Sequence, residues 1–150
     1  MIWNRPVLIF ALLCAVVSLE AFAPVRADEH EKGDIIVEIS GAGSNDGKIL
    51  WRMFSNKQTF ENPEDGGVTE GECELEDYKC TFVIPEINFG EYAIMAGHDL
   101  NNDQEISKSP FSAEKKAITN YDEKIYWFPD FKKAKFPHSE GSTMVRMKLY

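Results

Sequence analysis

The side chains with the clearest potential for chemistry lie in loop 99–105, where oxygen-bearing residues recur at every second position. Asp99, Asn101 and Asp103 occupy its first, third and fifth places, and the backbone carbonyl of Glu105 falls at the seventh. Loops that wrap calcium use this spacing, because alternate side chains converge on one point and Ca²⁺ prefers oxygen ligands. The spacing therefore predicts a calcium site.

The match to a calcium loop is partial. Gln104 stands where such loops have a glycine for the sharp turn, and Pro110 stands where a bidentate glutamate belongs. Because one of the three side-chain ligands is neutral, we expect a dissociation constant of about 10⁻⁴ to 10⁻³ M, as in extracellular modules. The alternative is a turn rich in Asp and Asn that bonds its own backbone without metal.

A second metal motif depends on where the chain is cut. Cleavage after Ala27 would leave Asp28, Glu29 and His30 as the new amino terminus. A free amine, two amide nitrogens and a third-position imidazole can wrap a square-planar ion, the geometry suited to Cu(II) or Ni(II). The alternative is a chance histidine in a charged tail.

The sequence gives little support for a catalytic site. His98 and Asp99 adjoin the polar loop, but neighbouring strand residues point to opposite faces and cannot form a dyad. No serine elbow, phosphate loop or zinc spacing supplies the groups that a hydrolase or metalloenzyme needs. Paired carboxylates of a glycoside hydrolase are an alternative only because acidic residues are abundant. We therefore expect that the protein is not an enzyme.

Cys73 and Cys80 are the two cysteines that would remain after an amino-terminal leader is removed. A hairpin turning at Glu76 and Asp77 would place them directly opposite, with α-carbons about 4.5 to 5.5 Å apart, which is within disulfide range. We predict a disulfide that adds about 2 to 2.5 kcal/mol of stability. A redox or metal pair is the alternative, although CxxC spacing is absent.

Residues 1–27 have the pattern of a signal peptide. Arg5 is followed by the apolar stretch 7–19, which is shorter than the roughly 20 residues that span a bilayer. We expect cleavage after Ala27, with Ala23 as the competing site and an uncleaved anchor as the alternative. A periplasmic or secreted location follows, without stable membrane insertion after cleavage.

The length and net charge of the chain limit the number of domains and the kinds of ligand that it can bind. A chain of 150 residues with a net charge of -9 allows one domain and argues against nucleic-acid binding, which needs clustered Lys and Arg. We expect a disordered charged leader over 28–33 and one folded domain over 34–150.

The remaining elements are expected to be mostly strands. Apolar residues at every second position predict strands at 35–40, 49–53, 73–84 (as the hairpin), 92–97, 124–128, 131–136 and 143–150. A polar loop is expected over 56–67, and only 112–118 resembles a helix. About seven strands predict an all-β fold, a single antiparallel β-sandwich.

Two segments carry a family resemblance. The run Phe89-Gly90-Glu91-Tyr92-Ala93-Ile94-Met95-Ala96-Gly97-His98-Asp99-Leu100-Asn101-Asn102-Asp103 and the later Pro129-Asp130-Phe131-Lys132-Lys133-Ala134 resemble the signature of the domain-of-unknown-function 2141 family (DUF2141). Asn88-Phe89 stands where that family often has Pro-Pro, and Gln104 replaces its loop glycine. The resemblance implies a small exported bacterial protein with a transthyretin-like sandwich, and it implies no particular activity.

These observations leave two functional classes. The first is a non-catalytic binding or adaptor module of the cell envelope that touches a protein or a glycan. The second is a weak calcium-binding or sensing module that uses loop 99–105.

Overall fold

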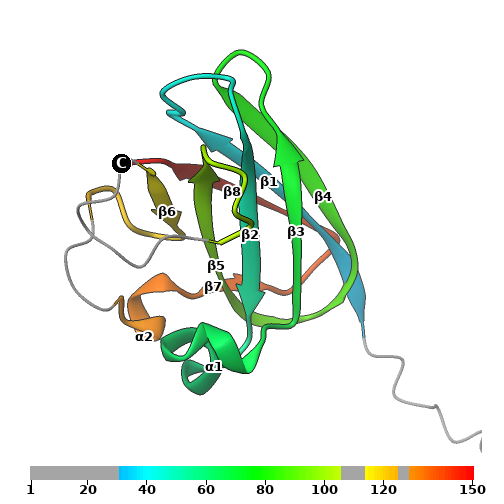
Figure 1. Ribbon diagram of the computed structural model, residues 1–150. Coiled ribbons are helices and arrows are strands. Elements are labelled where there is room, and N and C mark those ends of the chain that lie inside the picture. The colour runs from blue at the N-terminus through cyan, green and yellow to red at the C-terminus, as the bar shows by residue number, and fades with distance from the viewer. Residues whose placement is uncertain (1–30, 106–113, 125–128) are drawn as a thin grey trace, which may run out of the picture.

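Eight strands form two sheets in the computed structural model, which describes residues 31–105, 114–124 and 129–150 (Figure 1). The strands are β1 (Lys32–Ser40), β2 (Lys48–Phe54), β3 (Thr69–Glu74), β4 (Lys79–Asn88), β5 (Gly90–Asp99), β6 (Lys116–Ile118), β7 (Phe136–His138) and β8 (Ser142–Lys148). One sheet has the order β4-β1-β8, and the other has the order β3-β2-β5-β6 with β7 paired to β5. The predicted all-β sandwich is confirmed.

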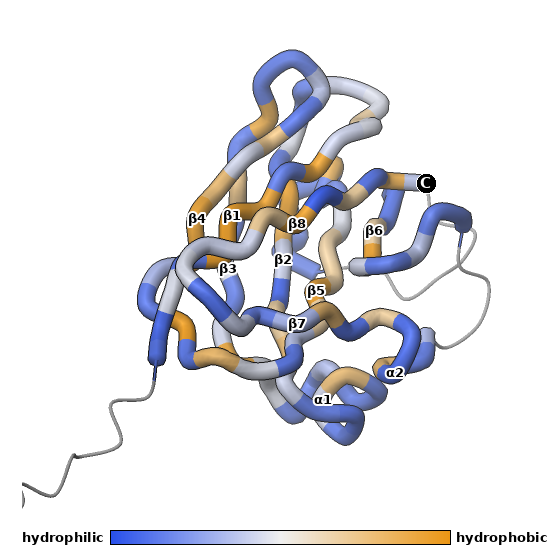
Figure 2. Tube along the Cα trace, turned by 180° about the vertical axis from the view of Figure 1, so that it is seen from behind, coloured by the Kyte–Doolittle hydropathy of each residue, from blue (hydrophilic) through white to orange (hydrophobic). Residues whose placement is uncertain are grey.

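Period-two alternation sets which side chains enter the core between the sheets. Ile35, Val37 and Ile39 of β1 are fully buried, as their alternation predicts. Val145 and Met147 of β8 are also buried, while Arg146 between them is exposed. Figure 2 shows the apolar residues concentrated along β1, β4 and β8. Burial of these alternating residues is what holds the two sheets together.

One pair of strands departs from the predicted antiparallel arrangement. β1 and β8 run parallel, with Ile35 beside Thr143 and Ile39 beside Met147. Antiparallel neighbours can be joined by a tight turn, whereas a parallel pair needs a long crossover. Since nearly the whole domain lies between β1 and β8, no turn in the sequence specifies their relative direction.

The turn between β3 and β4 is shifted by one residue from the prediction. Asp77 and Tyr78 occupy its centre with φ values of 50° and 62°, and the flanking pair is Glu76 with Lys79. Two left-handed central residues define the turn that matches strand twist in a hairpin. A tertiary contact holds it, because the backbone N–H of Tyr78 donates to Asn45 Oδ1 at 2.8 Å. The prediction that Glu76 and Asp77 form the turn is therefore wrong.

Short helices replace two segments that were predicted otherwise. They are α1 (Lys57–Glu61), η1 (Pro63–Asp65) and α2 (Phe131–Ala134). Loop 56–67 thus contains helical turns, and the strand predicted over 131–136 is a helix that leads into β7. The helix considered at 112–118 is wrong for its last residues, which form β6. The strand predicted at 124–128 lies almost wholly outside the described residues.

A second, smaller core lies beneath α1 and α2. Phe54, Phe60, Ala93, Ile118 and Ala134 are its buried members. The two helices lie side by side at the end of the sandwich where β2 ends (Figure 1). The helices thus cover apolar residues that the main core does not include.

The folded domain begins slightly earlier than the sequence predicts. β1 begins at Lys32, so strand structure starts two residues before the domain boundary predicted at Asp34. Within the described residues, no helix has the length and apolar character needed to cross a membrane.

Candidate functional site

Loop 99–105 lies at the end of the sandwich opposite α1 and α2. The start of β2 pairs with the end of β5, so Lys48 lies beside Asp99, whereas Phe54 at the other end of β2 lies beside Ala93. Loop 41–47 leads directly into β2 and reaches the same end. The candidate site is therefore held by the most extensively paired strands of the larger sheet.

Asp99 fixes the backbone of its own loop. Asp99 is 1% exposed, and its carboxylate accepts hydrogen bonds from the backbone N–H groups of Asp103 at 3.2 Å and Gln104 at 3.1 Å, one to each oxygen. Gln104 adopts a left-handed φ of 65°. Gln104 thus makes the sharp turn that the sequence comparison assigned to a glycine, because Asp99 holds its N–H in place.

The other predicted ligands also bond within the loop. Asn101 Oδ1 accepts from the N–H of Asp103 at 3.0 Å, and Asn101 Nδ2 donates to Asp103 Oδ2 at 2.8 Å. The exposed Glu105 donates its N–H to Asp103 Oδ1 at 2.8 Å. The self-bonded turn predicted as the alternative is therefore present, and Asn101 directs its side chain to Asp103.

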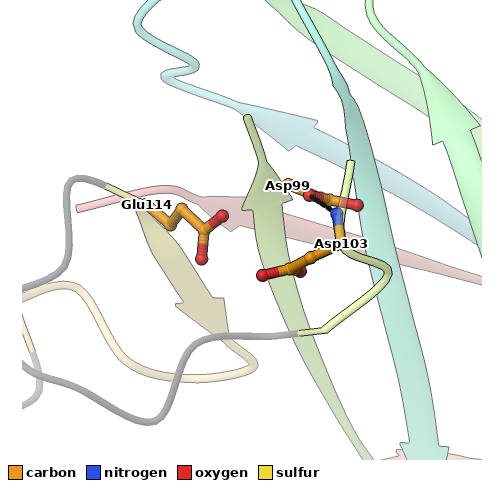
Figure 3. Close-up of side chains that lie close together, drawn as sticks. All are labelled: Asp99, Asp103 and Glu114. Carbon is orange, nitrogen blue, oxygen red and sulfur yellow. Dashed lines mark hydrogen bonds between the residues drawn. The ribbon is translucent and has the colours of Figure 1, made fainter. Parts of the chain in front are cut away.

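A third carboxylate joins this turn from another part of the chain. Single carboxylate oxygens of Asp99, Asp103 and Glu114 lie within 4.8 Å of one another (Figure 3). Figure 3 shows Glu114 approaching the two aspartates from the segment that leads into β6. Three acids from two loop segments are the strongest candidate for a metal centre in the described part of the chain.

The sequence reasoning missed Glu114, although its signal was present. β5 and β6 are antiparallel, with Gly97 beside Lys116. Continuing this register by two residues places Asp99 opposite Glu114. Interpreting 112–118 as a helix hid that register, and with it the third carboxylate.

Two lysines lie near the acidic cluster. The pKa of Lys48 is raised by a hydrogen bond to Glu72 and by the charges of Glu72 and Asp99, against partial desolvation. The pKa of Lys116 is lowered by burial, which the charge of Glu114 opposes. Both cations offset part of the negative charge of the cluster.

The His98 side chain bonds to the backbone of loop 41–47 and does not pair with Asp99. Its Nε2 lies 2.7 Å from the backbone carbonyl of Asp46, so this nitrogen carries the proton. His98 also lines a hollow of about 130 Å³, together with Gly43, Ser44, Leu100 and Lys115. Sites for small organic ligands are typically about 300 to 1,000 Å³. The hollow is too small for such a ligand.

The remaining predicted site residues divide into two groups. Cys73 and Cys80 are both free thiols in the structure. The structure therefore does not show the predicted disulfide, which stays a prediction. Asp28, Glu29 and His30 lie outside the described residues.

Comparisons with known proteins now identify the family. No curated protein and no solved structure matches the chain, so the transthyretin-like detail of the fold stays a prediction. The model of one family, described as an uncharacterized protein conserved in bacteria (DUF2141), matches residues 37–146. The matched region covers well over half of the chain and includes Asp99, Asp103 and Glu114. The chain belongs to the DUF2141 family.

Proposed function

We propose that this protein is an exported, non-catalytic module of the cell envelope that binds calcium weakly through Asp99, Asp103 and Glu114. The observation that carries the proposal is the convergence of the three carboxylates within 4.8 Å. Calcium–oxygen distances are about 2.3 to 2.6 Å, so two oxygens on one ion lie at most about 5 Å apart. The cluster already has this dimension.

Electrostatics favours a cation at this position. Two ionised carboxylates at such a separation repel by about 3 kcal/mol at the effective dielectric constant of a protein surface. Asp99 is the buried member of the cluster. The two backbone hydrogen bonds that it accepts use one lone pair on each of its carboxylate oxygens. The remaining lone pairs are available to a hard cation, which would cancel the repulsion.

A calcium titration of thermal stability tests the proposal. At 10 mM calcium, a dissociation constant of about 10⁻⁴ to 10⁻³ M gives about 1.4 to 2.7 kcal/mol of added stability, or roughly 5 to 10 °C in melting temperature. Glu114→Gln removes one charge with little change of shape and is expected to abolish most of this gain. The measurement is a melting curve by circular dichroism, in calcium and in chelator.

Glu105→Gln is the matched control for this experiment. Glu105 is exposed in the same loop but is not one of the three clustered acids, and the substitution keeps its backbone carbonyl. Its calcium response should equal that of the unmodified protein. Identical melting curves for the unmodified protein in calcium and in chelator would leave only the self-bonded turn.

A protein-binding adaptor is the second candidate, and one surface feature favours it. Val83 and Met144 are 53% and 49% exposed, and both lie beside Ile36 on the three-stranded sheet. These aliphatic side chains form an apolar row across its outer face. An apolar row without an aromatic ring favours a protein partner over a glycan.

Crosslinking in intact cells tests the adaptor. A protein of the cell envelope should crosslink to the unmodified chain, and Met144→Glu should remove that band because it places a charge in the apolar row. Glu140→Gln, at another exposed position, serves as the control. The same crosslinked bands from the unmodified chain and Met144→Glu would contradict the role of this face.

Sequencing of the mature amino terminus tests both export and the amino-terminal metal motif. Sequencing of the mature terminus should begin at Asp28 if cleavage follows Ala27. That product is expected to bind Cu(II) with an affinity that falls steeply in acid, because the terminal amine and amides must lose protons. Any other start, including one after Ala23, would remove the copper motif.

A further inference from the structure

The two sheets are joined along one pair of edges and open along the other. On the joined side, Lys116 of β6 exchanges backbone hydrogen bonds with Tyr150, which follows β8, at 3.4 and 3.0 Å. On the other side β3 and β4 share a single bridge, Glu76 with Lys79, next to their turn. Beyond it the strands separate, because β3 pairs with β2 and β4 pairs with β1. These unjoined edges of β3 and β4 form an open seam.

Cys73 and Cys80 face each other across the open seam. Cys73 lies beside Ile49 in one sheet, and Cys80 lies beside Ile39 in the other. Both cysteines contact the main core, so their side chains share its interior face. The two thiols are close enough that each affects the pKa of the other. A covalent bond here would connect the two sheets, rather than reinforce paired strands of one sheet.

The two thiols differ in accessibility. Cys80 is 4% exposed, whereas Cys73 is half-buried at the sheet edge. Burial raises the pKa of the Cys80 thiol far above its usual range, and the neighbouring Cys73 thiol raises it further. Burial also raises the pKa of Cys73, but the Cys80 thiol and a hydrogen bond from the Thr81 backbone oppose that change. Cys73 is the thiol that an external reagent can reach.

We propose that Cys73 and Cys80 form a redox-controlled bond between the two sheets, in which an external disulfide reacts first with Cys73 and Cys80 completes the bond. The oxidant is a disulfide of the exporting compartment, either a small molecule or a thiol–disulfide oxidoreductase. The Cys73 thiolate attacks one sulfur of that disulfide, forming a mixed disulfide and releasing one thiolate.

The second step consumes the mixed disulfide. Cys80 loses its proton and attacks Cys73 Sγ, so that the Cys73–Cys80 bond forms and the second external thiolate leaves. In total, two cysteine thiols are oxidised, one external disulfide is reduced to two thiols, and the protons pass to solvent or to those thiols. Both cysteines are free thiols, so their sulfurs must approach to about 2.05 Å for the bond to form. β3 and β4 are each at the edge of their sheet, so neither is held in place by a second neighbouring strand at the seam.

Single-cysteine variants of the mature chain test the order of the two steps. Each reduced protein is treated with oxidised glutathione and analysed by intact mass, without denaturant. Cys80→Ser should retain one glutathione on Cys73, because no second thiol can displace it. Cys73→Ser should stay unmodified in native buffer and gain one glutathione only in denaturant.

The unmodified chain supplies the remaining readouts. It should lose two hydrogens, retain no glutathione and melt at a higher temperature than its reduced form, and reductant should restore both the two hydrogens and the lower melting temperature. Circular dichroism of both variants verifies that they are folded before the reaction. Modification of Cys73→Ser in native buffer as fast as of Cys80→Ser would overturn the order. Retained glutathione on the unmodified chain, or no reaction at all, would overturn the bond between the sheets.

Discussion

Replacing Phe60 by alanine is expected to lower the free energy of unfolding by about 3 to 5 kcal/mol. Phe60 is 1% exposed and packs edge-on against Phe54 and Phe131, with ring centroids 5.4 and 5.5 Å away. Removing the ring takes away apolar contacts that α1 supplies and leaves a cavity that the surrounding side chains fill only in part. Urea denaturation with linear extrapolation measures the loss.

Val83→Ala is the control for this core variant. Val83 is 53% exposed, so its truncation should change stability by no more than about 0.5 kcal/mol. A loss below about 1 kcal/mol for Phe60→Ala would show that α1 contributes little to the folded state. Since the small core and loop 99–105 lie at opposite ends of β2 and β5, the stability gained from calcium should be the same in Phe60→Ala as in the unmodified protein.

The strands could be predicted because their alternation reports burial directly. In β1 and β8, the alternate apolar residues Ile35, Val37, Ile39, Val145 and Met147 face the core and each intervening position is less buried, so the alternation reports burial. The helices could not be predicted in this way. α1 and α2 have 5 and 4 residues, which is too short for a helical period to appear. Their signals are the caps Asn56 and Asp130, each accepting a backbone hydrogen bond in the first turn.

The candidate site was predicted in part for a similar reason. Asp99, Asn101 and Asp103 belong to one local loop, so their spacing was sufficient to predict that they lie together. Glu114 reaches the same place through the pairing of β5 with β6, which local spacing does not encode. The shifted turn at Asp77 and Tyr78 likewise depends on Asn45, more than thirty residues away. Contacts between distant segments decide both features.

Gly47→Ala is expected to lower the free energy of unfolding by about 3 kcal/mol, and to weaken calcium binding as well. Gly47 has a φ of 71°, and a Cβ at this position would lie 2.1 Å from the backbone carbonyl oxygen of Asp99. A left-handed backbone costs a non-glycine residue about 1 to 2 kcal/mol, and the forced shift of packed atoms adds about 1 to 3 kcal/mol. The atom that must move belongs to Asp99, so the carboxylate cluster moves with it.

Two other glycines separate these contributions. Gly66 has a φ of 91° and open space around its Cβ position, so Gly66→Ala should show the backbone cost of about 1 to 2 kcal/mol alone. Gly43 has neither a positive φ nor a neighbour within 4 Å, so Gly43→Ala should stay within about 0.5 kcal/mol of the unmodified protein. Urea denaturation in chelator and in 10 mM calcium measures all three variants. Only Gly47→Ala should lose the calcium response, because only at Gly47 does the added carbon collide with the residue that anchors loop 99–105. An unchanged calcium response in Gly47→Ala would mean that the position of Asp99 does not control the site.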